Sequence, residues 1–128
     1  MFAIIAKTAR IITLLNNEKD EKNMKDLTSL IERIEMCEQR LGVRLEGLYA
    51  KINIYGSLCI NGELHTDVEL LHPLYLIASV LDSQGRVQDT SKKYISDKEF
   101  FYLFTFSFEF NKENFKEVAK IRIYPEKC

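Results

Sequence analysis

The chain has 128 residues, which suits one domain around one hydrophobic core. Apolar residues make up 46% of it and charged residues 29%, a composition that excludes a disordered tail, a collagen-like fibre and a low-complexity linker. Its 18 basic and 19 acidic side chains give a net charge of −1, so the sequence offers no broad positive surface. We therefore expect neither nucleic acid nor a membrane among its partners.

The N-terminal third of the chain is predicted to be helical, because its first 41 residues contain neither proline nor glycine. Apolar residues fall three or four apart from Phe2 to Ile12, which predicts an amphipathic helix over about residues 2–15. The stretch of residues 11–15 fits a strand equally well.

A second helix is predicted between Asn23, which can cap its start, and Gly42, which suits a left-handed end. Its apolar residues form one stripe, made of Leu27, Leu30, Ile31, Ile34, Cys37 and Leu41. This stripe has two interpretations: the helix packs against the sheet of its own chain, or it binds a second copy or another partner. The two helices together define a helical N-terminal segment over residues 1–47.

From residue 48 onward, apolar and polar residues alternate, which is typical of strands. The first strand is predicted over residues 48–60, with a bulge at Gly56. The dipeptide Asn61-Gly62 predicts a two-residue hairpin turn, and the returning strand covers residues 63–71.

Four more strands are predicted over residues 74–80, 86–95, 100–110 and 119–123, with a turn at 82–85. The strand of residues 100–110 has an aromatic residue at every even position, which makes one of its faces a large apolar surface. The predicted core combines that even face (Phe100, Tyr102, Phe104, Phe106, Phe108 and Phe110) with Ile52, Ile54, Leu76, Val80 and Ile121.

These elements predict an α+β fold, in which the helical segment of residues 1–47 precedes an antiparallel β-sandwich of about six strands over residues 48–128. Antiparallel pairing is expected throughout, because the connections are short and no crossover helix is available for parallel strands. No internal repeat or low-complexity tract interrupts the chain.

The three cysteines, Cys37, Cys59 and Cys128, form no Cys-x-x-Cys pair, which indicates reduced thiols in a reducing compartment. The apolar run of residues 1–15 carries basic side chains within it, unlike a secretory signal. No stretch approaches the roughly 20 apolar residues of a membrane span. We therefore expect a cytoplasmic protein.

Candidate chemistry centres on Cys59, His65 and Asp67, and Glu69 adds a carboxylate for a metal site on the face of His65 and Asp67. His65 and Asp67 lie on one face of a predicted strand, and Cys59 lies across the predicted hairpin. This trio defines an alternative function, a small hydrolase or a metal-binding protein. A solvent-facing strand shows the same residue types, and no nucleophile or phosphate-binding motif accompanies them. We therefore expect no catalytic residue, metal or cofactor, and no enzyme activity.

The segment LIASVLDSQGRV (residues 76–87) has an apolar strand that ends in an acidic-x-x-Gly turn. It resembles the central hairpin of FxLYD-type bacterial β-sandwich modules. Asp82 matches the last motif letter, while Ala78, Val80 and Leu81 stand at the Phe, Leu and Tyr places. The resemblance extends to residues 57–69 and 120–125 and leaves residues 1–47 outside. It implies an immunoglobulin- or transthyretin-like sandwich and transfers no catalytic residues.

The function predicted from these features is that of a non-enzymatic protein-binding module. One form of it is an inhibitor or immunity-type protein that blocks a cytoplasmic partner, because small sandwiches present outer faces and strand edges to partners. A homodimer through the helical segment is also expected, because its second apolar stripe would otherwise be exposed. The candidate interface residues are Ile5, Ile12, Leu27, Ile31, Ile34, Tyr49, Tyr55, Arg122 and Tyr124.

Overall fold

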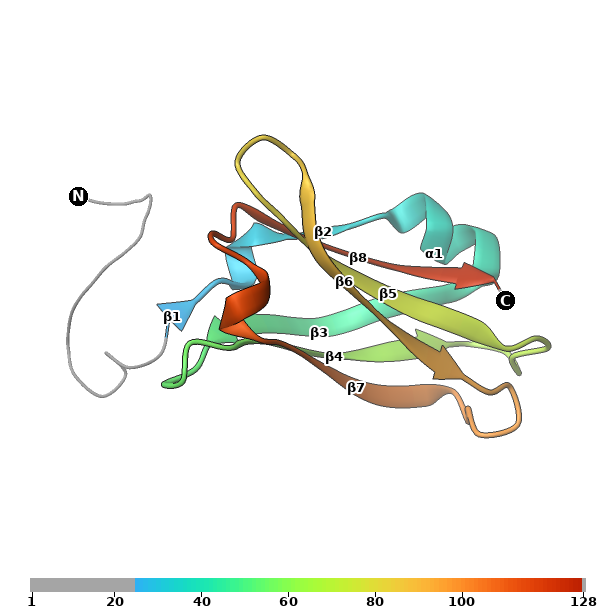
Figure 1. The fold of residues 1–128 in the computed structure, drawn as a ribbon. Coiled ribbons are helices and arrows are strands. Elements are labelled where there is room, and N and C mark those ends of the chain that lie inside the picture. The colour runs from blue at the N-terminus through green and yellow to red at the C-terminus, as the bar shows by residue number, and fades with distance from the viewer. Residues whose placement is uncertain (1–24, 128) are drawn as a thin grey trace.

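The computed structural model describes residues 25–127, which form two four-stranded sheets (Figure 1). The first sheet contains, in spatial order, β1 (Lys25–Asp26), β3 (Val43–Ile52), β4 (Leu58–Thr66) and β7 (Leu103–Phe110). The second contains β2 (Ile31–Arg33), β8 (Lys120–Lys127), β5 (Leu74–Leu81) and β6 (Val87–Ile95). One hydrophobic cluster joins residues of both sheets, an arrangement compatible with a β-sandwich.

The predicted α+β fold class is wrong, because the protein is mostly β and the second N-terminal helix does not form as expected. Within residues 25–127, the α-helical structure is one short helix, α1 (Glu35–Leu41), and two 3-10 turns, η2 (Thr28–Leu30) and η3 (Lys112–Asn114), accompany it. Gly42 ends α1 in the left-handed conformation, with φ at 72°, as predicted. The helix expected over residues 2–15 lies outside the described residues.

Strand β2 replaces the middle of the expected second helix. It runs parallel to β8, with Ile31 opposite Ile121, whereas every other strand pair is antiparallel. The expectation of purely antiparallel pairing is therefore wrong for this pair. Glu32 of β2 stabilises the pairing with β8: its carboxylate accepts a hydrogen bond from Arg122 at 3.0 Å and lies 3.6 Å from the Lys120 amine. These partners are about 90 residues away, so the local sequence pattern could not reveal them.

The β3–β4 hairpin turns at residues 53–57 and not at the predicted dipeptide Asn61-Gly62. The side-chain Oδ1 of Asn53 accepts hydrogen bonds from the amides of Tyr55 at 2.9 Å and Ser57 at 3.0 Å. Gly56 supplies the positive φ of 85° that the turn requires. Strand β3 begins at Val43 and so runs across the boundary predicted between residues 47 and 48.

Gly62 lies inside β4, opposite Phe106 of β7. A Cβ atom at position 62 would come 2.7 Å from Leu48 Cδ2 and 2.8 Å from Phe106 Cζ. Close packing of an aromatic ring, and not a turn, therefore accounts for glycine at this position.

The predicted core is confirmed for most of its members. Phe100, Phe106, Phe108, Phe110, Leu76, Val80 and Ile121 are buried, and Phe104 and Ile52 are half-buried. Ile54 and Tyr102 are exposed instead. Ile54 belongs to the β3–β4 turn, and Tyr102 has a positive φ of 70°, which breaks the strand alternation just before β7 begins.

Candidate protein-interaction site

The structure separates Cys59 from His65 instead of bringing them together. Both lie on β4, where Cys59 is opposite Lys51 and His65 is opposite Arg44. Six residues of extended strand place them about 20 Å apart. His65 Nε2 contacts Glu63 Oε1 at 2.9 Å, so its nearest acidic partner is a strand neighbour.

The other groups of the proposed trio have partners of their own. Asp67 contacts the Arg44 guanidinium at 3.1 Å. Cys59 accepts a hydrogen bond from Asn53 Nδ2 at 3.6 Å, and burial raises the pKa of its thiol above the ordinary value. No group of three potential metal ligands occurs among residues 25–127. Cys59, His65 and Asp67 therefore cannot act together on one substrate atom.

The predicted interface residues do not form one patch. Ile5 and Ile12 lie outside the described residues. Leu27 is buried in the core, and Ile31 and Ile34 are half-buried rather than aligned along a helix. The others lie on separate surfaces: Tyr49 on the outer face of the first sheet, Tyr55 in the β3–β4 turn, and Arg122 and Tyr124 on β8. The helical stripe on which the expected dimer depended is therefore absent from residues 25–41.

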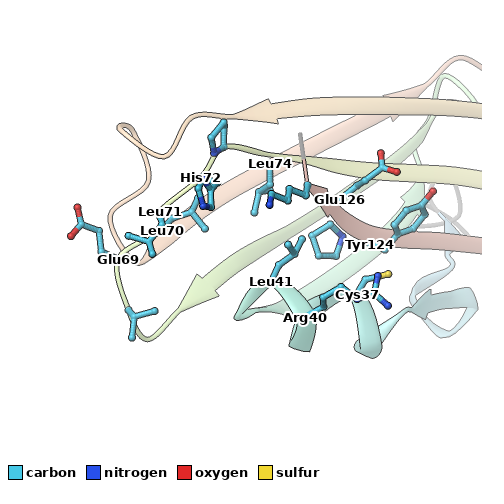
Figure 2. Close-up of a pocket in the computed structure, with 14 residues that line it drawn as sticks. Cys37, Arg40, Leu41, Glu69, Leu70, Leu71, His72, Leu74, Tyr124 and Glu126 are labelled. Atoms are coloured by element: carbon cyan, nitrogen blue, oxygen red, sulfur yellow. The ribbon is translucent and has the colours of Figure 1, made fainter.

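A groove of about 650 Å³ lies at the end of the molecule that holds α1 (Figure 2). It is bounded by α1, by the loop of residues 67–73 and by the last residues of β8. Its apolar lining includes Leu41 of α1 and Leu74 of β5 (Figure 2). Its polar lining mixes basic and acidic groups and a histidine, namely Arg40, Glu69, His72, Glu126 and Lys127. Because both charges are present, the lining does not favour one class of ligand over another.

The four outermost strands of the two sheets differ in how they are protected against pairing with another chain. Strands β1 and β2 are only two and three residues long. Strand β6 carries Asp89, Lys92 and Lys93, and lysine on an edge strand disfavours further pairing. Strand β7 has eight residues, no proline, no lysine and one charged side chain, Glu109. Natural sheets protect most edges, and β7 lacks these protections.

The outward side of β7, which we call the β7 edge, borders the first sheet (Figure 1), and no strand among residues 25–127 pairs with it. The amide of Thr66 donates to the carbonyl of Tyr102 at 3.1 Å, which fixes the hydrogen-bonding phase between β4 and β7. By alternation, Phe104, Phe106, Phe108 and Phe110 bond to β4. The N–H and C=O groups of Thr105, Ser107 and Glu109 point away from it, and no strand of residues 25–127 pairs with them. Leu103 also points away from β4, but it forms an isolated bridge with Phe101.

An apolar surface adjoins the N-terminal end of the β7 edge. Phe101, Tyr102 and Leu103 are 75%, 54% and 48% exposed, and they follow one another in the chain. Contiguous exposed apolar residues mark interaction sites more often than isolated ones do. The aromatic alternation predicted that the even positions of this strand lie in the core, but it gave no indication of the unpaired edge. The available signal was the scarcity of charge in β7 compared with β6.

Comparison with known proteins identifies no relative: no family model, no curated protein and no solved structure matches the chain. The resemblance of residues 76–87 to FxLYD-type modules therefore stays a prediction. Among the described helices, none has the length and apolar character needed to cross a membrane.

Proposed function

We propose that this protein is a non-enzymatic, cytoplasmic protein-binding module, which takes an extended segment of its partner as an additional strand on the β7 edge. The observation that carries the proposal is the unprotected β7 edge, where Thr105, Ser107 and Glu109 offer N–H and C=O groups in strand spacing. Strand addition is a recurrent mode of peptide recognition, in which main-chain hydrogen bonds supply affinity.

An inhibitor or immunity-type role fits this binding mode. A partner segment held as a strand is kept extended and is unavailable for its own contacts, which is how a small protein can block a larger one. Because the other three edge strands, β1, β2 and β6, are protected against pairing, such a segment is expected to bind at β7.

A selection of random peptides displayed on phage, with the full chain as the target, tests the proposal. Selected peptides are then measured for binding to Ser107→Pro and to the matched control Ser107→Ala. Proline removes the outward N–H of residue 107 without removing a hydrogen bond to β4, whereas alanine keeps that N–H.

We expect Ser107→Pro to weaken binding by about tenfold and Ser107→Ala to bind like the unmodified protein. Thermal melts of both variants establish that the fold is retained. Equal binding by the two variants, or a selection that yields no peptide, would contradict strand addition at β7.

A further inference from the structure

We infer that the segment bound at the β7 edge is basic at its N-terminal end and bulky and apolar at its C-terminal end, an inference that rests on the proposed function. The outward side chains of β7 change character along the strand. Leu103 is apolar, Thr105 and Ser107 are small and uncharged, and Glu109 is negative. A segment that pairs with β7 is therefore recognised mainly at its two ends, by Glu109 and by Leu103.

Glu109 defines the basic end of the segment. It is exposed, and it forms no hydrogen bond or ion pair with any other residue between 25 and 127. Glu109 is paired with Cys59 of β4, and Cys59 is paired in turn with Lys51 of β3. Opposite charges directly across a strand pair are favourable, and like charges are unfavourable, so lysine or arginine is preferred opposite Glu109.

The basic side chain must lie on the outer face of the sheet. On the inner side of β7, the amine of Lys93 lies 5.8 Å from the ring centroid of Phe108. A second cation on that side would meet Lys93, whereas on the outer side it meets Glu109. The inner positions of the segment therefore carry no basic side chain.

Leu103 defines the apolar end of the segment, together with exposed Phe101 and Tyr102. Phe104 is half-buried on the inner face, and its ring lies 6.4 Å from that of Phe100. A bulky apolar side chain opposite Leu103 would cover part of the exposed surface formed by Phe101, Tyr102 and Leu103. This is the largest exposed apolar surface along β7.

The direction of the segment follows from the sheet. All pairs of the first sheet are antiparallel, and antiparallel pairing is slightly more stable for each residue than parallel pairing. An antiparallel segment meets Glu109 first and Leu103 six residues later. The order is therefore a basic residue, then uncharged residues of strand type, then a bulky apolar residue.

A second copy of β7 fits this description poorly. Antiparallel pairing of two β7 strands with Leu103 opposite Glu109 leaves both glutamates without a basic partner. Alignment of Glu109 with Glu109 places like charges opposite one another. The chemistry of the edge therefore favours a segment of a different protein.

Two peptides that differ only in their first residue, KVTVTVL and EVTVTVL, test the inference. Each carries a soluble tail and a fluorophore, and binding is measured by anisotropy on the full chain. We expect the lysine peptide to bind the unmodified protein about two- to fivefold more tightly than the glutamate peptide. On Glu109→Lys the preference reverses, and on Glu109→Gln it disappears.

The exposed residue Glu126 of β8 provides the matched control, because Glu126→Gln removes the same charge from the second sheet. This variant keeps the preference of the unmodified protein. Binding of both peptides with equal affinity would overturn the inference but leave strand addition intact. A dimer of the full chain that Ser107→Pro dissociates would also overturn it, because a second copy would then be the occupant. Failure of both peptides and of the peptide selection would instead overturn the proposed function.

Discussion

The carboxylate of Glu38, which is only 2% exposed, accepts hydrogen bonds from Arg33 Nε at 3.0 Å and from Arg33 Nη2 at 2.7 Å. A further hydrogen bond comes from the backbone amide of Leu45 at 3.0 Å. These contacts join α1 to β2 and β3, and the Glu38 carboxylate holds the pKa of Arg33 above its ordinary value. The buried carboxylate thus connects the short helix to both sheets.

Glu38→Ala is expected to lower the free energy of unfolding by about 2–3 kcal/mol, because the Leu45 amide loses its acceptor and Arg33 loses its partner. Partial exposure of Arg33 keeps the loss below that of a fully buried pair. Glu35→Ala is the control, since that exposed carboxylate lies 3.9 Å from Arg33 and contributes little. Urea unfolding measures both variants, and equal losses would contradict the role of Glu38.

Gly62→Ala is expected to destabilise the protein by about 1–3 kcal/mol, because its methyl group would overlap the buried ring of Phe106. Asn61→Ala, at the adjacent outward position, is expected to change stability by about 0.5 kcal/mol or less. Thermal or urea melts distinguish this account from the hairpin prediction. If Asn61 and Gly62 formed the turn, loss of the asparagine would be the costly change.

Stability is expected to fall as the solution becomes acidic, and Glu32 and Asp82 contribute to the fall. A hydrogen bond from Arg122 holds the pKa of Glu32 below its ordinary value, and backbone amides of Arg86 and Gln84 do the same for the pKa of Asp82. A depressed pKa in the folded state stabilises the protein above the ordinary carboxyl pKa of about 4. That stabilisation is lost as the pH falls through the folded-state pKa.

Urea midpoints measured between about pH 6 and pH 3 test this dependence. Glu32→Gln and Asp82→Asn are each expected to reduce the difference between the two ends of the range. A difference that neither substitution alters would show that other groups control the acid sensitivity.

Local patterns predicted the parts of the fold that depend on neighbouring residues. The aromatic alternation located the strand of Phe104 to Phe110, Gly42 marked the end of a helix, and residues 82–85 form a turn. In that turn, Asp82 Oδ1 accepts from the amides of Gln84 and Arg86, both at 2.9 Å. Such signals arise within a few residues, so the sequence alone reveals them.

Features decided by distant contacts could not be predicted in the same way. Ile31 fits a helical stripe, but it pairs with Ile121 of β8. Gly62 follows an asparagine, which is a turn signal, but its environment is set by Phe106. The β7 edge depends on which strands become neighbours, and this follows from the topology of the whole sheet rather than from the composition of any one strand.

Residue-resolved amide hydrogen exchange shows whether the β7 edge is available for pairing with another strand. In the free protein, the amides of Thr105, Ser107 and Glu109 are expected to exchange much faster than those of Phe104, Phe106, Phe108 and Phe110, which bond to β4. Saturation with the KVTVTVL peptide is expected to slow the first set and leave the second unchanged. Equal protection of both sets in the free protein would contradict the account, and so would an outward set that still exchanges rapidly at saturation.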